Sequence, residues 1–182
     1  MQFGVFDHMD ASGEPLAQLF ENRLRLAEAY DRLGLYALHI AEHHSTPLGM
    51  SPSPSVFLAL AAQRTKRLRL GPLVYTLPLY HPLRLAEEIC TLDQLSGGRL
   101  ELGVGRGVSA LEIASFGVDP AKSQAMYLEA YQVVMTALAS KSVSFRGEHY
   151  RFDDAPVILE PVADLFARAV MPELAPAPVP AA

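Results

Sequence analysis

Four short apolar segments, each followed by a segment of helical periodicity, constrain the fold more than any other feature of the sequence. The expected strands cover residues 2–6, 35–41, 67–76 and 99–104. The expected helices cover residues 14–34, 55–65, 83–95, 111–116 and 121–140. Strands and helices that alternate through short connections are typical of parallel βαβ units. The sequence therefore predicts an α/β fold with a parallel sheet.

The pattern changes toward the end of the chain. Residues 142–152 alternate about Arg146-Gly147-Glu148, which predicts a small β-hairpin, and residues 153–161 are expected to be extended. Residues 164–171 could form one more helix before a segment rich in Pro and Ala. We therefore expect one domain over 1–161 and a divergent, disordered tail over 162–182.

Composition excludes several classes of partner. The net charge of −5 argues against nucleic acid, because a phosphate-binding face needs clustered Lys and Arg. No apolar run approaches 18 residues and no signal peptide is recognisable, so no membrane association is expected. Cys90 is the only cysteine, which fits a reducing compartment. A cytoplasmic location is predicted.

The expected strand at 35–41 runs directly into Glu42, His43 and His44. Parallel α/β folds place their chemistry at the carboxyl ends of strands, and imidazole is suited to acid–base work near neutral pH. The simpler alternative is a loop with solvated histidines. A metal site that includes His39 is a third alternative, but adjacent histidines on a strand point to opposite faces, so no metal is predicted.

A second polar turn, Gly105-Arg106-Gly107, follows the expected strand at 99–104. Glycines let backbone N–H groups approach an anion, and a guanidinium offers a planar fork to a phosphate. A tight turn with a solvated arginine is the alternative. The spacing is not that of the dinucleotide-binding fingerprint, because Val108 follows and the third glycine comes one residue early.

Four segments, in order, resemble the N-terminal half of the bacterial luciferase-like flavin monooxygenases. They are MQFGVF at 1–6, AEHH at 41–44, HPLRLAEEICTLDQLSGGRLELGVGRG at 81–107, and the hairpin leading into ILEP at 158–161. The third segment is the most specific, because it joins a helix, a corner, a strand and a Gly-Arg-Gly turn. The resemblance covers roughly residues 1–161.

This resemblance implies a (β/α)8 barrel of the TIM type, of which the chain would supply about four to five βα units and a small hairpin insertion. It implies an enzyme that binds reduced FMN at the C-terminal face and uses O2 to oxygenate a small organic substrate. A related branch uses the deazaflavin F420, which is the alternative cofactor. A flavin reductase would supply the reduced FMN.

The same resemblance assigns catalytic roles after the second strand. His43 matches a histidine proposed as a general base or as a group that stabilises the oxygenated flavin. His44 is a second catalytic candidate, although a structural role suits it better, and Glu42 would approach the isoalloxazine. His39 stands where many relatives have Trp.

The remaining cofactor-binding assignments fall on later strands. Leu73 and Val74 match the segment that packs beneath the flavin ring, often through a non-prolyl cis peptide. Gly105, Arg106 and Gly107 would hold the flavin phosphate. Gly105 replaces the reactive Cys of the luciferase light-emitting subunit, so luminescence is not implied.

A complete barrel takes about 250 residues, and this chain has 182. Four strands alone leave two open sheet edges and inward side chains unburied, at about 1.5–3 kcal/mol for each large one. That loss exceeds an ordinary domain stability of about 5–15 kcal/mol. We therefore expect a homodimer or a completing partner chain. The alternative function is a non-catalytic flavin-binding half-barrel, a partner subunit or an inactive truncated product.

Overall fold

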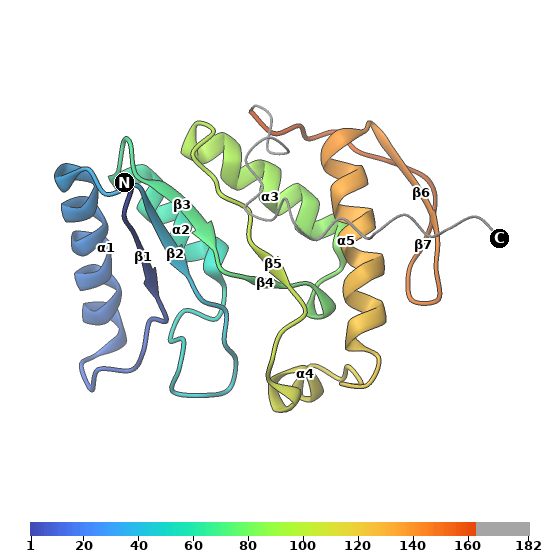
Figure 1. Ribbon diagram of the computed structural model, residues 1–182, viewed down its shortest axis with the longest axis horizontal. Coiled ribbons are helices and arrows are strands. Elements are labelled where there is room, and N and C mark those ends of the chain that lie inside the picture. Colours follow the sequence, from blue (N-terminus) through green and yellow to red (C-terminus); the bar gives the residue numbers. More distant parts are fainter. Residues whose placement is uncertain (163–182) are drawn as a thin grey trace.

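The computed structural model describes residues 1–162. The strands are β1 (Gly4–Asp7), β2 (Ala37–Ile40), β3 (Arg69–Pro72), β4 (Tyr75–Thr76), β5 (Val104–Gly105), β6 (Ser142–Arg146) and β7 (Arg151–Pro156) (Figure 1). The helices are α1 (Leu16–Leu33), α2 (Pro54–Arg64), η1 (Leu77–Leu79), α3 (Pro82–Ser96), α4 (Ala110–Ser115) and α5 (Ser123–Ala139). The helix expected over 164–171 lies outside the described residues.

The sheet is parallel, as predicted. Strands β1, β2 and β3 are neighbours in that order, with Phe6 opposite His39 and His39 opposite Gly71. Strand β4 pairs in parallel with β5, and a parallel bridge joins Leu70 to Leu100. Four chain segments therefore run side by side in one direction, which confirms the expected half of a TIM-type barrel.

The prediction of one uninterrupted strand over 67–76 is wrong. The N–H of Leu73 bonds to Ile40 of β2, whereas the N–H of Tyr75 bonds to Gly103. Pairing with β2 thus ends at Leu73, whereas pairing with residues 99–105, already present at Leu70, resumes at Tyr75. The Leu73–Val74 peptide bond between them is cis. The strand expected over 99–104 is likewise reduced to the bridge at Leu100 and to β5.

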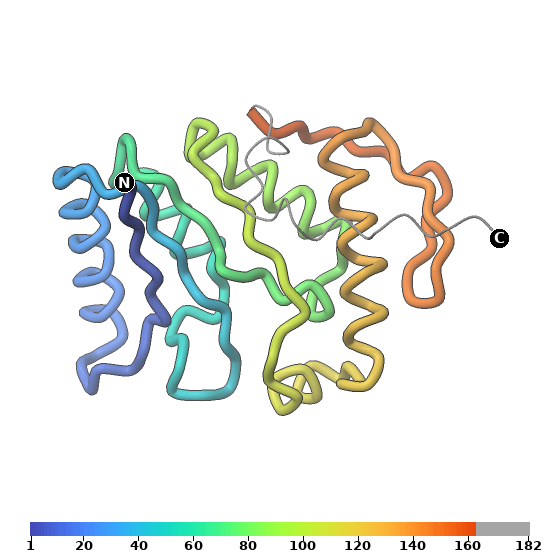
Figure 2. The backbone as a smooth tube through the Cα atoms, viewed as in Figure 1, coloured from blue at the N-terminus to red at the C-terminus, as the bar shows by residue number. Residues whose placement is uncertain are grey.

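The core lies between the sheet and the helices. Leu38 and Ile40 of β2 and Leu70 of β3 are buried against helical residues. Helix α2 packs between α1 and α3, and α3 packs against α5; Figure 2 shows these helices following one another across the molecule. Burial of each large apolar side chain contributes about 1.5–3 kcal/mol, so this layer carries most of the stability.

The helix ends follow the sequence signals. Helix α1 stops at Gly34, whose positive φ of 78° provides a left-handed cap. Pro82 opens α3, because a proline at the first turn loses no helical hydrogen bond.

The predicted hairpin is present as β6 and β7, which pair antiparallel. Its second strand runs on to Pro156, beyond the expected end at 152. The carboxylate of Glu129 in α5 accepts the backbone N–H groups of Glu148, His149 and Tyr150 in the turn. This contact fixes the hairpin against the helix.

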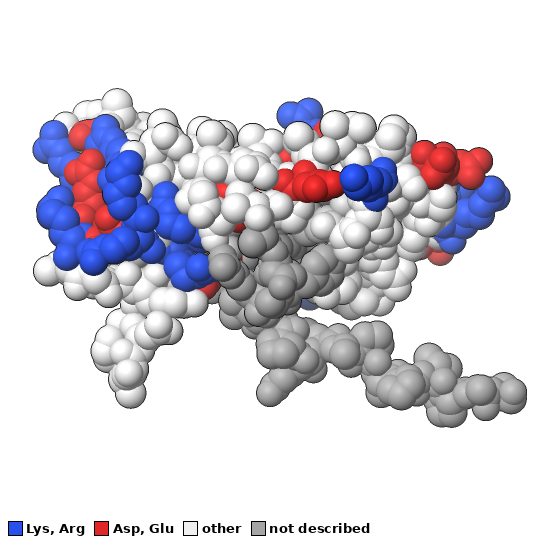
Figure 3. Space-filling view, turned by 90° about the horizontal axis from the view of Figure 1, so that it is seen from above, with Lys and Arg blue, Asp and Glu red and all other residues white. Residues whose placement is uncertain are grey.

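The face of the sheet that points away from the helices is exposed within residues 1–162. Phe6 is 46% exposed and Leu73 is 40% exposed on this side, and β1 lies at the edge of its sheet. Figure 3 views the end at which the strands begin, where basic and acidic side chains are mixed over α1. Arg64 pairs there with Glu21 and Glu28. Within residues 1–162, no helix has both the length and the apolar character to cross a bilayer.

Candidate active site

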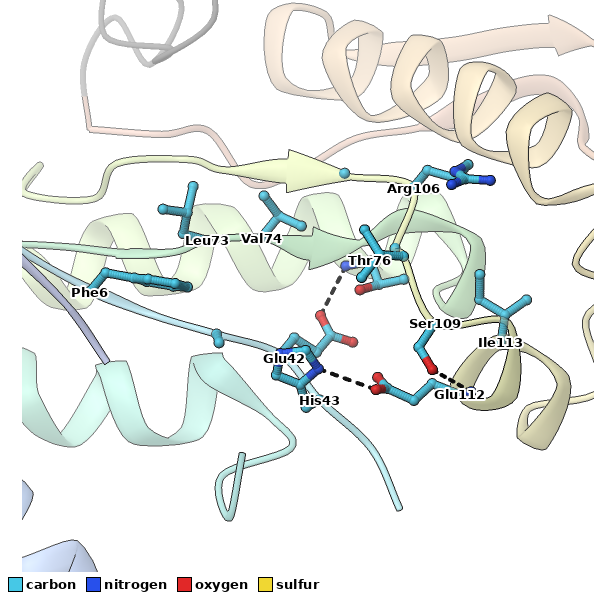
Figure 4. Close-up of a pocket in the computed structure, with 14 residues that line it drawn as sticks. Phe6, Glu42, His43, Leu73, Val74, Thr76, Arg106, Ser109, Glu112 and Ile113 are labelled. Carbon is cyan, nitrogen blue, oxygen red and sulfur yellow. Dashed lines mark hydrogen bonds and ion pairs between the residues drawn. The ribbon is translucent and has the colours of Figure 1, made fainter. Parts of the chain in front are cut away.

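A cavity of about 350 Å³ lies at the carboxyl ends of the parallel strands. This volume is within the range of about 300–1,000 Å³ that is usual for ligand pockets. Its walls come from the ends of β1, β2, β4 and β5, from the cis peptide segment and from the start of α4 (Figure 4). The lining includes every predicted site residue except His44: Glu42, His43, Leu73, Val74, Gly105, Arg106 and Gly107.

Glu42 is a buried anchor beneath this cavity. One carboxylate oxygen accepts the backbone N–H of Thr76 at 3.0 Å, and the other lies 2.8 Å from Nε2 of His44. Burial and the neighbouring Glu42 charge raise the pKa of Tyr80, which therefore stays a neutral phenol. Glu42 thus joins the end of β2 to β4 through both of its oxygens.

The two neighbouring histidines have separate surroundings. His43 lines the cavity, and its Nδ1 lies 3.2 Å from Oε1 of Glu112 in α4. The ring of His44 is bonded to Glu42 and packs edge-on against Phe116, with 4.6 Å between ring centroids. The geometry gives His43 access to a ligand and gives His44 a bracing contact.

The glycine turn forms a close-fitting wall. A Cβ at Gly105 would lie 2.6 Å from Cγ2 of Val74, and one at Gly107 would lie 2.6 Å from Cγ2 of Thr76. Gly107 also has a φ of 83°, which disfavours other residues. Only glycine therefore lets this backbone reach the cavity edge.

Arg106 lies between these glycines and is exposed. In the described part of the chain it makes no ion pair or hydrogen bond. Figure 4 shows Arg106 at one end of the cavity and Phe6, Leu73 and Val74 toward the other. The cavity therefore suits a ligand with a flat apolar portion and a separate anionic group.

Comparison with known proteins identifies the family. The family profile described as luciferase-like monooxygenase matches residues 1–178. The chain belongs to this family. The match continues past Pro161, where the motif resemblance ends.

Comparison with individual proteins gives the same result as the luciferase-like family profile. The chain is 53% identical over 161 residues to the uncharacterized protein y4wF of Sinorhizobium fredii, covering 88% of this chain and 47% of the relative. It superimposes on monooxygenase RslO1 from Streptomyces bottropensis with a TM-score of 0.86 and 33% identity, covering 91% of this chain and 51% of that one. It spans about half the length of these relatives.

A third similar protein has been solved with a flavin bound. The oxygenating constituent of 3,6-diketocamphane monooxygenase from Pseudomonas putida, solved in complex with FMN, superimposes with a TM-score of 0.79 and 26% identity. The match covers 86% of this chain and 44% of that one. The cis peptide at Leu73–Val74, expected from resemblance to the luciferase-like family, is present in the structure.

The sequence did not identify several residues that line this cavity. Phe6, Thr76, Ser109, Glu112 and Ile113 also line the cavity. Of these, Glu112 had a usable signal, because Ser109 and Glu112 have the spacing of a helix capping box directly after the glycine turn. In the described residues, no group of three or more His, Cys, Asp or Glu side chains is arranged to hold a metal ion.

A second polar cluster, outside the lining of the cavity, joins β2 and β3 to the segment after Leu100. Glu101 is buried, lies 3.2 Å from Nε2 of His39 and pairs with Arg69 at 2.5 Å. Burial opposes ionisation of Glu101, but hydrogen bonds from His39, Tyr36 and Arg69 outweigh it and lower its pKa to about 2. The carboxylate is therefore charged in the folded protein at every ordinary pH.

We expect this cluster to make stability depend on pH. The folded-state pKa of Glu101 lies below its ordinary value of 4.5, so its contribution is complete above that value and is lost as the pH falls toward 2. Urea unfolding of the native chain and of Glu101→Gln at pH 7, 4.5 and 3 measures the effect. Glu87→Gln, at an exposed position of α3, serves as the control. The loss of stability on acidification should be smaller in Glu101→Gln. Identical losses in all three proteins would contradict the assignment.

Proposed function

We propose that this chain forms the flavin-binding side of a luciferase-like monooxygenase that uses reduced FMN and O2 to oxygenate a small organic substrate. The observation that carries the proposal is the single cavity that combines an apolar end, an unpaired Arg106 and the imidazole of His43. The family membership and the likeness to an FMN complex support it.

The residues present fit FMN. The exposed side chains of Phe6 and Leu73, together with Val74, offer an apolar wall to the isoalloxazine ring. Arg106 would hold the phosphate through charge-assisted hydrogen bonds, and the absence of Cβ atoms at Gly105 and Gly107 lets the backbone that carries it pack closely against Val74 and Thr76. FMN would supply the electrons with which O2 is activated.

His43 would then accept or hold a proton beside the isoalloxazine ring, since an imidazole exchanges protons near neutral pH. Glu42 would keep the base of the site rigid, because both of its oxygens are already bonded. His44 would act through Glu42 and not on the ligand. A cover from the remaining barrel or from a second chain would exclude water, which this chemistry needs. A flavin reductase would supply the reduced cofactor.

Binding of FMN to the 182-residue chain, followed by O2 consumption with anaerobically reduced FMN and candidate substrates, tests the proposal. The deazaflavin F420 is measured alongside, because it shares the ring and phosphate chemistry. Failure to bind either cofactor overturns the proposal. Binding without O2 consumption under any condition would select the alternative of a non-catalytic flavin-binding half-barrel or partner subunit.

Arg106→Ala should weaken FMN binding about 10- to 100-fold, because a charge-assisted contact is worth about 1.5–3 kcal/mol. Riboflavin lacks the phosphate, so its affinity should be the same for the native chain and the variant. Arg146→Ala on the exposed hairpin removes the same charge elsewhere and serves as the control. Equal weakening of FMN and riboflavin would remove Arg106 from the phosphate site.

A further inference from the structure

We infer that Glu112 is the positioning residue for His43: it keeps the ring hydrogen on Nδ1 and thereby leaves Nε2 as the nitrogen that exchanges protons in the cavity. The chemical role of this nitrogen rests on the proposed function. The arrangement itself rests on contacts between α4, the end of β2 and the end of β1.

Glu112 clamps two consecutive residues. Its Oε1 lies 3.2 Å from Nδ1 of His43, and its Oε2 accepts the backbone N–H of His44 at 3.2 Å. A carboxylate can only accept hydrogen bonds, so the nitrogen that faces it carries the hydrogen. In imidazole, the hydrogen bond made by one nitrogen decides the state of the other. Nε2 of neutral His43 is therefore unprotonated.

The carboxylate of Glu112 is not used to cap its own helix. Ser109 accepts the N–H of Glu112 at 3.2 Å, which is the first half of a capping box. In a complete box the acidic side chain returns to the backbone N–H of the capping residue. Within the described residues the Glu112 carboxylate bonds to His43 and His44 instead, as Figure 4 shows for His43. This contact therefore serves the site and not the helix end.

A second contact holds the face of the His43 ring. His8, just after β1, is stacked on it with 5.5 Å between centroids and 12° between planes. His8 is itself packed edge-on against Phe6, with 4.7 Å between centroids. His43 is thus held at one edge by Glu112 and on one face by His8, which leaves the ring a single orientation.

The direct test is nuclear magnetic resonance of the ring nitrogens in the full chain, labelled with ¹⁵N-histidine, without flavin and at a pH where His43 is neutral. Loss of one signal set in His43→Gln assigns the residue. The native chain should carry the hydrogen on Nδ1. Glu112→Ala should shift the hydrogen to Nε2 in a large fraction of molecules. Glu112→Gln has one acceptor oxygen for two donors, and since the backbone N–H of His44 can only donate, its amide NH2 should face Nδ1 of His43 and move the hydrogen to Nε2 as well.

Ser109→Ala is the matched control, because it removes the cap of α4 and leaves the Glu112 carboxylate intact. The tautomer of His43 should not change in this variant. A native His43 with its hydrogen on Nε2, or an unchanged tautomer in Glu112→Ala, overturns the inference. This readout needs no bound cofactor, so it stands apart from the outcome of the flavin experiments.

Where turnover is observed, kinetics give a second readout. Glu112→Ala should lower kcat about 10- to 100-fold, a part of what a general base contributes, with the KM for reduced FMN within about twofold of native. Glu112→Gln should lose a similar share of kcat, because its amide NH2 would donate to Nδ1 of His43. Native kcat in Glu112→Gln would contradict positioning through the Nδ1 hydrogen. Absence of turnover in the native chain would refute the proposed function and leave the tautomer result intact.

Discussion

Replacement of Glu42 by alanine is expected to lower the free energy of unfolding by about 3–5 kcal/mol, because two donors lose a charged acceptor and each such hydrogen bond is worth about 1.5–3 kcal/mol. Glu42 is 6% exposed, and its two oxygens are bonded to Thr76 and His44. The variant leaves a buried N–H and a half-buried imidazole without an acceptor. Against a total stability of about 5–15 kcal/mol, this loss is large.

Two variants make the Glu42 experiment specific. Glu42→Gln keeps the shape and one acceptor oxygen, so its loss should be about 1–2 kcal/mol. Glu87→Ala removes an exposed acid from α3 and should change the stability by less than about 0.5 kcal/mol. Urea unfolding followed by far-ultraviolet circular dichroism gives the three values. A loss below about 1 kcal/mol for Glu42→Ala would show that the two contacts are not formed in solution.

Gly71→Ala should cost about 3 kcal/mol or more. A Cβ at this position would overlap the backbone carbonyl oxygen of Glu101 on the neighbouring strand, and a backbone atom cannot turn aside as a side chain can. Relief requires separation of β3 from the strand that contains Leu100, which would break their pairing. Overpacking of this kind commonly costs about 1–3 kcal/mol and more where backbone must move.

Gly4→Ala in the same sheet is the matched comparison. Its Cβ would lie 3.1 Å from the carbonyl oxygen of Ala37, a contact that a small adjustment relieves. Its loss should stay within about 1 kcal/mol, since alanine also reduces the entropy of the unfolded chain. Thermal unfolding of both variants measures the contrast. Similar melting temperatures for Gly4→Ala and Gly71→Ala would contradict the strand spacing described above.

Local patterns predicted most of the fold. Helical periodicity and caps such as Gly34 and Pro82 fixed the helices to within about two residues at most ends, because these signals lie within a few residues of what they determine. The parallel sheet followed from the order of the elements. The break after Leu73 did not, because the end of its pairing with β2 depends on residues far away in the sequence.

The sequence predicted some residues of the candidate site and missed others, for the same reason. His43 and Arg106 stand out at strand ends, and the structure places both on one cavity. Glu112 meets His43 across 69 positions, and its local pattern with Ser109 indicates only a helix cap. From the sequence alone, Gly105 is expected to let the backbone approach an anion. The structure adds a second reason for glycine at this position, because a Cβ would overlap the side chain of Val74.

The wall contributed by Gly105 and Gly107 is made of main chain alone. A surface without side chains cannot be reshaped by substitution, and at these positions even a methyl group is excluded by Val74 and Thr76. Discrimination between one ligand and another must therefore come from side chains elsewhere in the lining, where Phe6, Val108 and Ile113 present apolar groups. Altered selectivity should be sought at those three positions, while the glycine wall stays constant.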